Sequence, residues 1–299
     1  MISLTNRNGK EIPYIGLGTF PFEGRVMADM VKTAVKIGYR LFDTADDYRG
    51  ESGIGIALTE LETEGIFERG DLFIQTKISD NNAHADEPLI GVYFNSNNPF
   101  MQRHTVEEIV REKVEISLRE MKTDYLDSLL IHYPYPDYMV DIWKTMIQLR
   151  EEGIVRYIGV SNFHERHIEI LKKETGVTPQ INESYASPIG TKQSLIDYCN
   201  SNNCLFVTYS PLMDLTIGRI DISKLSDITS KYKKSPAQII LRWNIERGCL
   251  PLPKTKNPER LFENFDVLNF SLTNEEVSYL SSLNYDCQLL VESKICPGL

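Results

Sequence analysis

The strongest constraint on the fold of this chain is a regular alternation of short apolar runs with longer helical segments. Each run ends in polar residues, and the segment after it carries apolar residues at a period of about 3.6, typical of an amphipathic helix. The predicted strands are residues 15–18, 39–43, 72–77, 125–132, 155–161, 178–182, 205–209 and 249–253. The predicted helices are residues 26–37, 51–64, 105–121, 138–152, 165–174, 192–200, 236–247, 258–263 and 274–283.

Eight strand–helix repeats without a linker predict a single domain over residues 1–299. They favour an α/β fold of the (β/α)8 TIM barrel type over a doubly wound sheet. A doubly wound sheet that binds a dinucleotide should carry G-x-G-x-x-G after its first strand. Here Gly16-Leu17-Gly18 supplies only the first two glycines.

Two further segments accompany the barrel pattern. Asn8-Gly9 lies between two short apolar runs, and this strong turn signal predicts a short N-terminal β-hairpin. Residues 80–104, after the third strand, are rich in turn-forming residues and longer than an ordinary strand–helix connection. We expect this long insertion to shape a substrate site at the end of the barrel where the strands end.

Composition narrows the classes of function. The chain is 41% hydrophobic and 25% charged, as soluble globular proteins are, and its net charge of −10 gives binding to nucleic acid no electrostatic support. Its five cysteines never form a C-x-x-C pair, which argues against a disulfide framework and a zinc site. No apolar run reaches the ~18 residues of a membrane span. We therefore expect a cytoplasmic protein without cleavage, metal or membrane contact.

Polar residues stand at the end of almost every predicted strand, where the active sites of such barrels lie. Each has a structural explanation by itself: a lysine is usually solvated, a lone histidine is more often a satisfied core residue, and serine pairs form caps and turns. These explanations do not account for the recurrence from strand to strand, which favours an active site. The residues are Asp43, Lys77, His132, Ser161, Asn162, Glu183, Tyr209, Ser210, Lys254 and Thr255.

Four residues suit acid–base chemistry at a carbonyl group: Asp43, Tyr48, Lys77 and His132. A free tyrosine has a pKa of about 10, and a nearby ammonium group lowers it by favouring the phenolate. Asp43 supplies a counter-charge for Lys77, and a neutral His132 donates a hydrogen bond to the substrate oxygen. This set can protonate a carbonyl oxygen while a nicotinamide cofactor delivers hydride, which no side chain can do.

A series of short motifs runs in order along nearly the whole chain. They are Asn8-Gly9; residues 16–19; Asp43-Thr44-Ala45 with Tyr48 and Glu51; Thr76-Lys77; residues 125–127 and Ile131-His132; residues 159–163 and 209–212; Ala237-Gln238 with residues 241–243; and residues 253–255 with Arg260, Glu263 and Asn264. With these motifs the chain resembles the aldo-keto reductase family. The resemblance implies NADPH-dependent reduction of aldehydes and ketones, with Tyr48 as acid–base, Lys77 and Asp43 as its tuners, and His132 as the residue that orients the carbonyl.

The resemblance also assigns cofactor-binding residues, some with a local physical basis. Tyr209 offers a flat face for the nicotinamide, and Ser161 and Asn162 can hydrogen-bond its carboxamide. The set is Gly18, Thr19, Asp43, Ser161, Asn162, Glu183, Tyr209, Ser210, Pro211, Leu212, Lys254, Thr255, Lys256, Arg260, Glu263 and Asn264.

The basic residues of this set favour NADPH over NADH. Lys254, Thr255 and Arg260 lie beside the last strand and suit an adenosine 2′-phosphate. The alternative is a solvated basic patch, to which Lys256 adds a third cation. In a chain this acidic, a local basic cluster at a strand end favours the phosphate site.

The sequence departs from the family at one predicted cofactor-binding position and at two predicted substrate-pocket positions. Glu183 stands where a glutamine usually binds the nicotinamide amide, and a carboxylate accepts but cannot donate hydrogen bonds. Phe20 and Tyr133 take places often held by tryptophan, so the predicted substrate pocket, lined by these two residues with Tyr48 and His132, is aromatic but roomier and more polar. By resemblance, we also expect a small-molecule substrate and a monomer.

Two other classes of protein remain alternatives. One is a cofactor-binding regulatory or interaction protein on the same barrel, with the 80–104 insertion as a partner surface. A pure binding module, however, has no use for Tyr48 and Lys77 together. The other is a hydrolase with paired carboxylates such as Asp43 and Asp46, which leaves the basic residues of the cofactor set without a role.

Overall fold

The structure, a computed structural model, describes residues 3–80 and 104–289 of the chain. Eight parallel strands form one sheet in which each strand pairs with the next along the chain. The edges of the sheet meet, because the backbone N–H groups of Gly16 and Gly18 donate hydrogen bonds of 3.1 Å to the carbonyl oxygens of Pro251 and Pro253. The strands are β1 (Leu17–Gly18), β2 (Leu41–Asp43), β3 (Phe73–Ile78), β4 (Leu126–Ile131), β5 (Val155–Ser161), β6 (Ile181–Tyr185), β7 (Leu205–Tyr209) and β8 (Leu250–Leu252).

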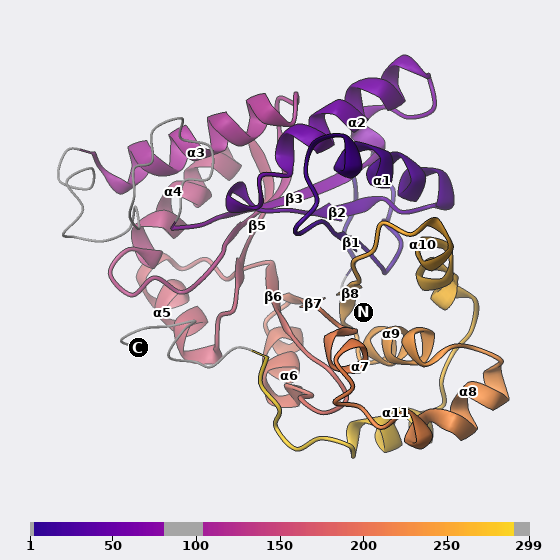
Figure 1. Ribbon diagram of the computed structural model, residues 1–299. Helices are drawn as coiled ribbons and strands as arrows, with labels where there is room; N and C mark the ends of the chain where they lie inside the picture. The colour runs from indigo at the N-terminus through magenta and orange to yellow at the C-terminus, as the bar shows by residue number, and fades with distance from the viewer. Residues whose placement is uncertain (1–2, 81–103, 290–299) are drawn as a thin grey trace.

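Helices surround these strands (Figure 1), and the predicted (β/α)8 TIM barrel is confirmed. Thr105, Ser235 and Thr273 begin their helices with reciprocal capping hydrogen bonds. Two helices that the sequence did not predict, α7 and α8, lie between β7 and α9. The α-helices are α1 (Gly24–Ile37), α2 (Glu51–Thr63), α3 (Val106–Glu120), α4 (Met139–Glu151), α5 (Glu165–Thr175), α6 (Gln193–Ser201), α7 (Met213–Thr216), α8 (Ser226–Tyr232), α9 (Pro236–Glu246), α10 (Pro258–Phe265) and α11 (Asn274–Ser281).

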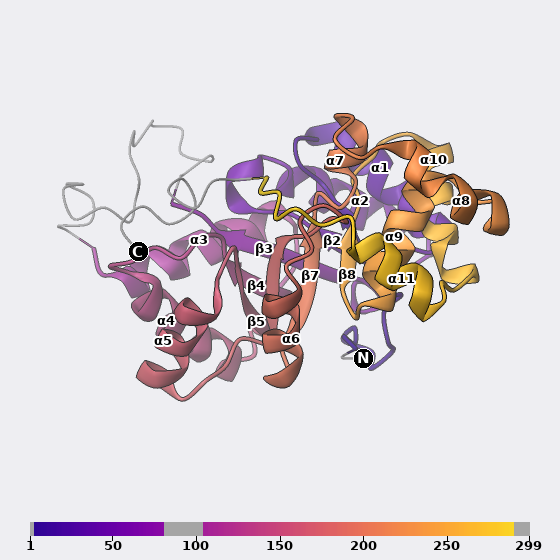
Figure 2. The same ribbon diagram turned by 90° about the horizontal axis from the view of Figure 1, so that it is seen from below.

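The N-terminal segment closes one end of the barrel. Gly9 has a φ of 77°, and Thr5 pairs with Glu11 through an antiparallel bridge, so the turn predicted from Asn8-Gly9 forms, although neither arm is a regular strand. Leu4 and Ile12 are buried with the apolar residues inside the barrel. Figure 2 shows this segment at one end of the barrel and α7 at the other.

Most of the insertion after β3 falls on residues 81–103, which lie outside the described residues. β6 spans Ile181–Tyr185 rather than residues 178–182, so Glu183 lies within the strand and not after it. In the described ranges, no helix combines the length and the apolar character needed to cross a membrane.

Candidate active site

A cavity of about 880 Å³ opens where the strands end. Residues of both the predicted catalytic set and the predicted cofactor set line it. Two predicted residues do not line it: Lys77 is buried beneath the wall, and Lys256 Nζ lies 5.9 Å from the ring centre of Phe22. The predicted residues that line the cavity are Gly18, Thr19, Phe20, Asp43, Tyr48, His132, Tyr133, Ser161, Asn162, Glu183, Tyr209, Ser210, Pro211, Leu212, Lys254, Thr255, Arg260, Glu263 and Asn264.

Strand alternation explains why polar side chains meet at this cavity. Leu41 and Phe73 pack inside the barrel near the start of β2 and β3. Because successive side chains point to opposite faces of a strand, Asp43, Gln75 and Lys77 face the same interior at every second position. Each inward row therefore changes from apolar to polar along the strand, which gives a packed floor beneath a polar cavity.

Lys77 is the centre of the buried charges. Its side chain is 1% exposed, and Nζ lies 2.6 Å from Asp43 Oδ1 and 3.3 Å from Glu183 Oε1. Nζ also donates a 3.0 Å hydrogen bond to the carbonyl oxygen of Thr44. Burial alone lowers the pKa of Lys77, but Asp43 and Glu183 together outweigh it and raise the pKa above its usual value. Lys77 is therefore an ammonium group throughout the neutral pH range.

Glu183 is a second acid of this cluster. It shares one donor with Asp43: Nε2 of Gln75 lies 2.9 Å from Asp43 Oδ1 and 2.8 Å from Glu183 Oε2. Burial, and then the charge of Asp43, raise the pKa of Glu183 to about 8. Glu183 therefore takes up a proton more readily than a free glutamate, and its protonated form can donate a hydrogen bond as well as accept one.

Tyr48 reaches the cavity from the short 3-10 helix Asp46–Tyr48 that follows β2. Its hydroxyl lies 3.5 Å from His132 Nε2, and Lys77 Nζ lies 5.3 Å from the centre of its ring. Burial raises the pKa of Tyr48; Lys77 lowers it, but Asp43 and Glu183 oppose Lys77. The net shift is opposite to that expected from the sequence, because the sequence does not reveal the burial. Tyr48 is held as a protonated phenol, the form that donates a proton.

His132 lies beside Tyr48 on the cavity wall. Its Nδ1 lies 2.6 Å from the hydroxyl oxygen of Ser79. Burial, and then the charges of Lys77 and Lys113, hold the pKa of His132 well below 6.5. The imidazole is therefore neutral, with one nitrogen as donor and the other as acceptor.

Asn162 connects the ends of β4, β5 and β7. Its backbone is left-handed, with a φ of 63°. Nδ2 donates to the carbonyl oxygen of His132 at 3.1 Å and to Ser161 Oγ at 3.2 Å, and Oδ1 accepts from the Tyr209 hydroxyl at 2.9 Å. These bonds fix the ring of Tyr209 at the cavity, but they also engage the Asn162 amide that the sequence assigns to a cofactor.

Part of the cavity lining is basic. Lys254, Thr255 and Arg260 line it, and within the described part of the chain neither cation forms an ion pair. Asn257 caps α10 by accepting hydrogen bonds from the backbone N–H groups of Glu259 and Arg260. Two cations without carboxylate partners, in a chain of net charge −10, fit a phosphate group.

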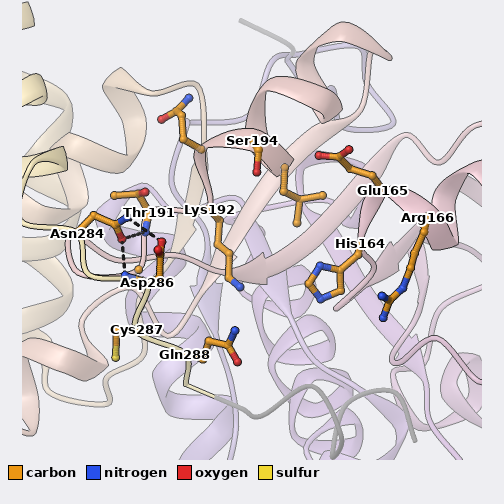
Figure 3. Close-up of a pocket in the computed structure, with 13 residues that line it drawn as sticks. His164, Glu165, Arg166, Thr191, Lys192, Ser194, Asn284, Asp286, Cys287 and Gln288 are labelled. Carbon is orange, nitrogen blue, oxygen red and sulfur yellow. Dashed lines mark hydrogen bonds between the residues drawn. The ribbon is translucent and has the colours of Figure 1, made fainter. Parts of the chain in front are cut away.

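A second cavity, of about 670 Å³, lies away from these residues, beside the first turns of α5 and α6. Figure 3 shows His164 and Arg166 on one side of it, the segment that carries Asn284 and Asp286 on the other, and Lys192 between them. It contains none of the predicted catalytic or cofactor residues. The chemistry predicted from the sequence therefore belongs to the larger cavity.

Three polar residues beside the predicted catalytic residues were not predicted from the sequence: Asp47, Gln75 and Ser79. Gln75 stands two positions before Lys77, and Ser79 stands two positions after it. Because side chains two apart along a strand point to the same face, this spacing was a signal that both residues share the face of Lys77. Asp47 offered no such signal. In the sequence, an acidic residue at a functional site cannot be distinguished from one that stabilises the start of a helix.

Comparison with known proteins decides the family. The sequence model of the Aldo/keto reductase family matches residues 14–285. The chain belongs to the aldo-keto reductase family. It is 35% identical over 280 residues to glyoxal reductase of Bacillus subtilis, covering 93% of this chain and 91% of that protein. It is 32% identical over 281 residues to methylglyoxal reductase DkgA of Escherichia coli strain K12, covering 93% and 92%.

Solved aldo-keto reductases have the same architecture. The aldose reductase of Schistosoma japonicum superposes with a TM-score of 0.82 at 28% identity, covering 99% of this chain and 96% of that one. A Bombyx mori aldo-keto reductase in complex with NADP superposes with a TM-score of 0.78 at 29% identity, covering 98% and 95%. This member of the family is accordingly an oxidoreductase.

Proposed function

We propose that the protein reduces aldehyde and ketone groups to alcohols, with Tyr48 as the proton donor. The observation that carries this proposal is the pair formed by the Tyr48 hydroxyl and His132 Nε2, 3.5 Å apart on the cavity wall. A carbonyl oxygen that contacts both groups can receive a hydrogen bond from each. Lys77, beneath the ring of Tyr48, stabilises the phenolate that remains after proton transfer.

NADPH supplies the hydride in this reaction. The residues proposed to bind NADPH line the cavity between the aromatic residues near Tyr48 and the basic residues Lys254 and Arg260. Tyr209 presents a ring whose hydroxyl is fixed by Asn162, and Glu183 lines the wall beside it. Lys254 and Arg260 hold the phosphate at the basic end, which accounts for their lack of carboxylate partners.

Aromatic side chains form the substrate end of the proposed site. The ring centres of Phe20 and Tyr48 lie 5.0 Å apart, and Tyr133 stacks on His132 at 4.6 Å. The relatives named as glyoxal and methylglyoxal reductases make small 2-oxoaldehydes the first substrates to test. The aromatic wall also suits aryl aldehydes such as benzaldehyde.

The test is the loss of NADPH absorbance with glyoxal, methylglyoxal and a panel of simple aldehydes and ketones. Tyr48→Phe should lower kcat at least about 100-fold, because general acid catalysis contributes ~10²–10⁴. Tyr279→Phe, a change at a tyrosine that is 44% exposed, is the control and should retain activity. Saturable NADPH binding without turnover of any carbonyl compound would instead support the regulatory or interaction protein.

A further inference from the structure

Glu183 places a carboxyl group on the wall of the cavity to which the cofactor is assigned. It stands on β6 between Ser161 of β5 and Val207 of β7, its partners in the sheet. Its side chain is 3% exposed, and it lines the same cavity as Tyr48 and Tyr209. A charge on this carboxyl group is surrounded by protein rather than by water, so it acts strongly on a molecule bound in the cavity.

Glu183 is one of two acids that share a single buried cation. Its Oε1 lies 3.3 Å from Lys77 Nζ, which lies 2.6 Å from Asp43 Oδ1. Gln75 Nε2 donates to both acids, at 2.9 Å to Asp43 Oδ1 and at 2.8 Å to Glu183 Oε2. This cluster has one negative charge in excess when both acids are ionised, and it is neutral when Glu183 is protonated.

The proposed reaction changes a charge inside this cavity. Loss of hydride turns the neutral nicotinamide ring of NADPH into the positively charged ring of NADP⁺. The ring has to lie beside a carbonyl group held by Tyr48 and His132, because hydride passes directly between the two. Lys77 Nζ lies 5.3 Å from the centre of the Tyr48 ring, and Glu183 contacts Lys77. The new positive charge therefore arises close to the cluster of Lys77, Asp43 and Glu183.

We propose that the carboxylate of Glu183 makes the site favour NADP⁺ over NADPH. The excess negative charge of the cluster attracts the positive ring and has much less effect on the neutral ring, so it changes the ratio of the two affinities. A glutamine of the same shape carries no charge and cannot make this distinction. Tighter binding of NADP⁺ than of NADPH makes the bound cofactor a stronger hydride donor. The role assigned to Glu183 rests on the proposed function, because it takes the nicotinamide cofactor as the occupant of the cavity.

This preference depends on pH through the ionisation of Glu183. Burial, and then Asp43, raise the pKa of Glu183 to about 8, whereas Lys77 lowers it. A positive ring nearby favours the ionised carboxyl group and lowers this pKa, so the affinity for NADP⁺ rises as pH rises through it. Glu183 releases one proton to solvent in this change. The pKa values of Lys77 and of the tyrosines around Glu183 are raised, so these groups stay protonated meanwhile. The titratable groups that face Glu183 are Asp43, Tyr48, Lys77, Tyr133 and Tyr209.

The experiment is titration calorimetry of the full-length protein with NADP⁺ and NADPH in turn, without any carbonyl compound. Both nucleotides carry the same 2′-phosphate, so its contribution cancels in the comparison. From about pH 6.5 to about pH 9.5, the ratio of the association constant of NADP⁺ to that of NADPH should rise about 10-fold, because an opposite charge nearby lowers a carboxyl pKa by ~1 or more. At about pH 8, buffers of different ionisation enthalpy should show more proton release with NADP⁺ than with NADPH.

Glu183→Gln keeps the size of the side chain and removes its charge, so the ratio of the two affinities should no longer change with pH. Glu51→Gln is the matched control, the same change at another buried glutamate. Glu51 Oε1 accepts a 2.7 Å hydrogen bond from the Thr76 hydroxyl, burial raises the pKa of Glu51 to about 7, and Glu51 does not line the cavity. This variant should keep the pH dependence of the wild type.

Three results would overturn the role of Glu183: an affinity ratio independent of pH in the wild type, equal proton release with the two nucleotides, or a ratio in Glu183→Gln that follows the wild type. None of them bears on whether the protein reduces carbonyl compounds, because no carbonyl compound is present. Lack of turnover with every carbonyl compound would contradict the proposed function and leave the affinity ratio unchanged. Absence of binding by both nucleotides would contradict the proposed cofactor and the role of Glu183 together.

Discussion

Glu183 Oε1 lies 3.3 Å from Lys77 Nζ, so the ammonium group beneath Tyr48 has a second acidic partner in addition to Asp43. The family resemblance leads us to expect a neutral glutamine at this position, and the structure gives the change a physical consequence. Lys77, Asp43 and Glu183 form a cluster whose net charge depends on the protonation of Glu183.

Glu183→Gln should flatten the pH dependence of stability. Glu183 titrates near pH 4.3 in an unfolded chain, about the free value, but its pKa in the folded protein is about 8. Between these values the folded state binds more protons, so the free energy of unfolding falls as pH rises. Urea unfolding from about pH 5 to about pH 9 should show a larger loss for wild type than for Glu183→Gln. The exposed Glu115→Gln is the control; equal slopes for wild type and Glu183→Gln would contradict the prediction.

Lys77→Met should destabilise the fold by about 3–5 kcal/mol, because it leaves buried carboxyl groups without their cation. Glu183→Gln in the Lys77→Met background should recover part of this loss, since one unpaired acid is then removed. Urea unfolding of the wild type, both single variants and the double variant measures the coupling between Lys77 and Glu183. Additive effects within about 0.3 kcal/mol would show that the two groups do not interact.

Arg260→Ala should weaken NADPH binding by about 10- to 100-fold, the effect of losing a hydrogen bond to a charged group worth ~1.5–3 kcal/mol. The affinity for NADH, which has no 2′-phosphate, should remain unchanged. Fluorescence titration with each cofactor measures both dissociation constants, and Arg119→Ala, at an exposed position on α3, is the control. An equal loss of affinity for both cofactors would show that Arg260 does not bind the 2′-phosphate. A hydrolase with paired carboxylates should not respond to either cofactor.

Phe20→Ala should change substrate preference with little effect on folding. Phe20 is 54% exposed, so its removal should alter the free energy of unfolding by no more than about 0.5 kcal/mol. Its ring lies 5.0 Å from that of Tyr48 and can pack against an aromatic substrate. The KM for benzaldehyde should rise about 2- to 10-fold, as expected for an aromatic contact of ~0.5–1.5 kcal/mol. The KM for methylglyoxal should stay the same; parallel changes would argue against this contact.

Local sequence patterns determined most of the fold. β5 and β7 have the predicted bounds because each is a short apolar run between clear turn or helix signals. β6 begins later than predicted, because its pairing with β5 and β7 starts at Ile181, and pairing partners are not visible in a local window. The helices α7 and α8 were missed for a related reason: both are short, and helices of this length depend on tertiary packing that a local window does not show.

The sequence by itself determined the barrel and brought the predicted acid–base residues to one face, because strand ends of one barrel meet there and the family motifs stand at those ends. Only the tertiary structure decided the charge states of that group. Burial holds Tyr48 as a phenol, and two carboxyl groups share Lys77. Ser79 and Asp47 likewise reach His132 only through the fold. The pKa of a side chain depends on distances to charges and on exclusion of water, and both are set by segments far apart in the chain.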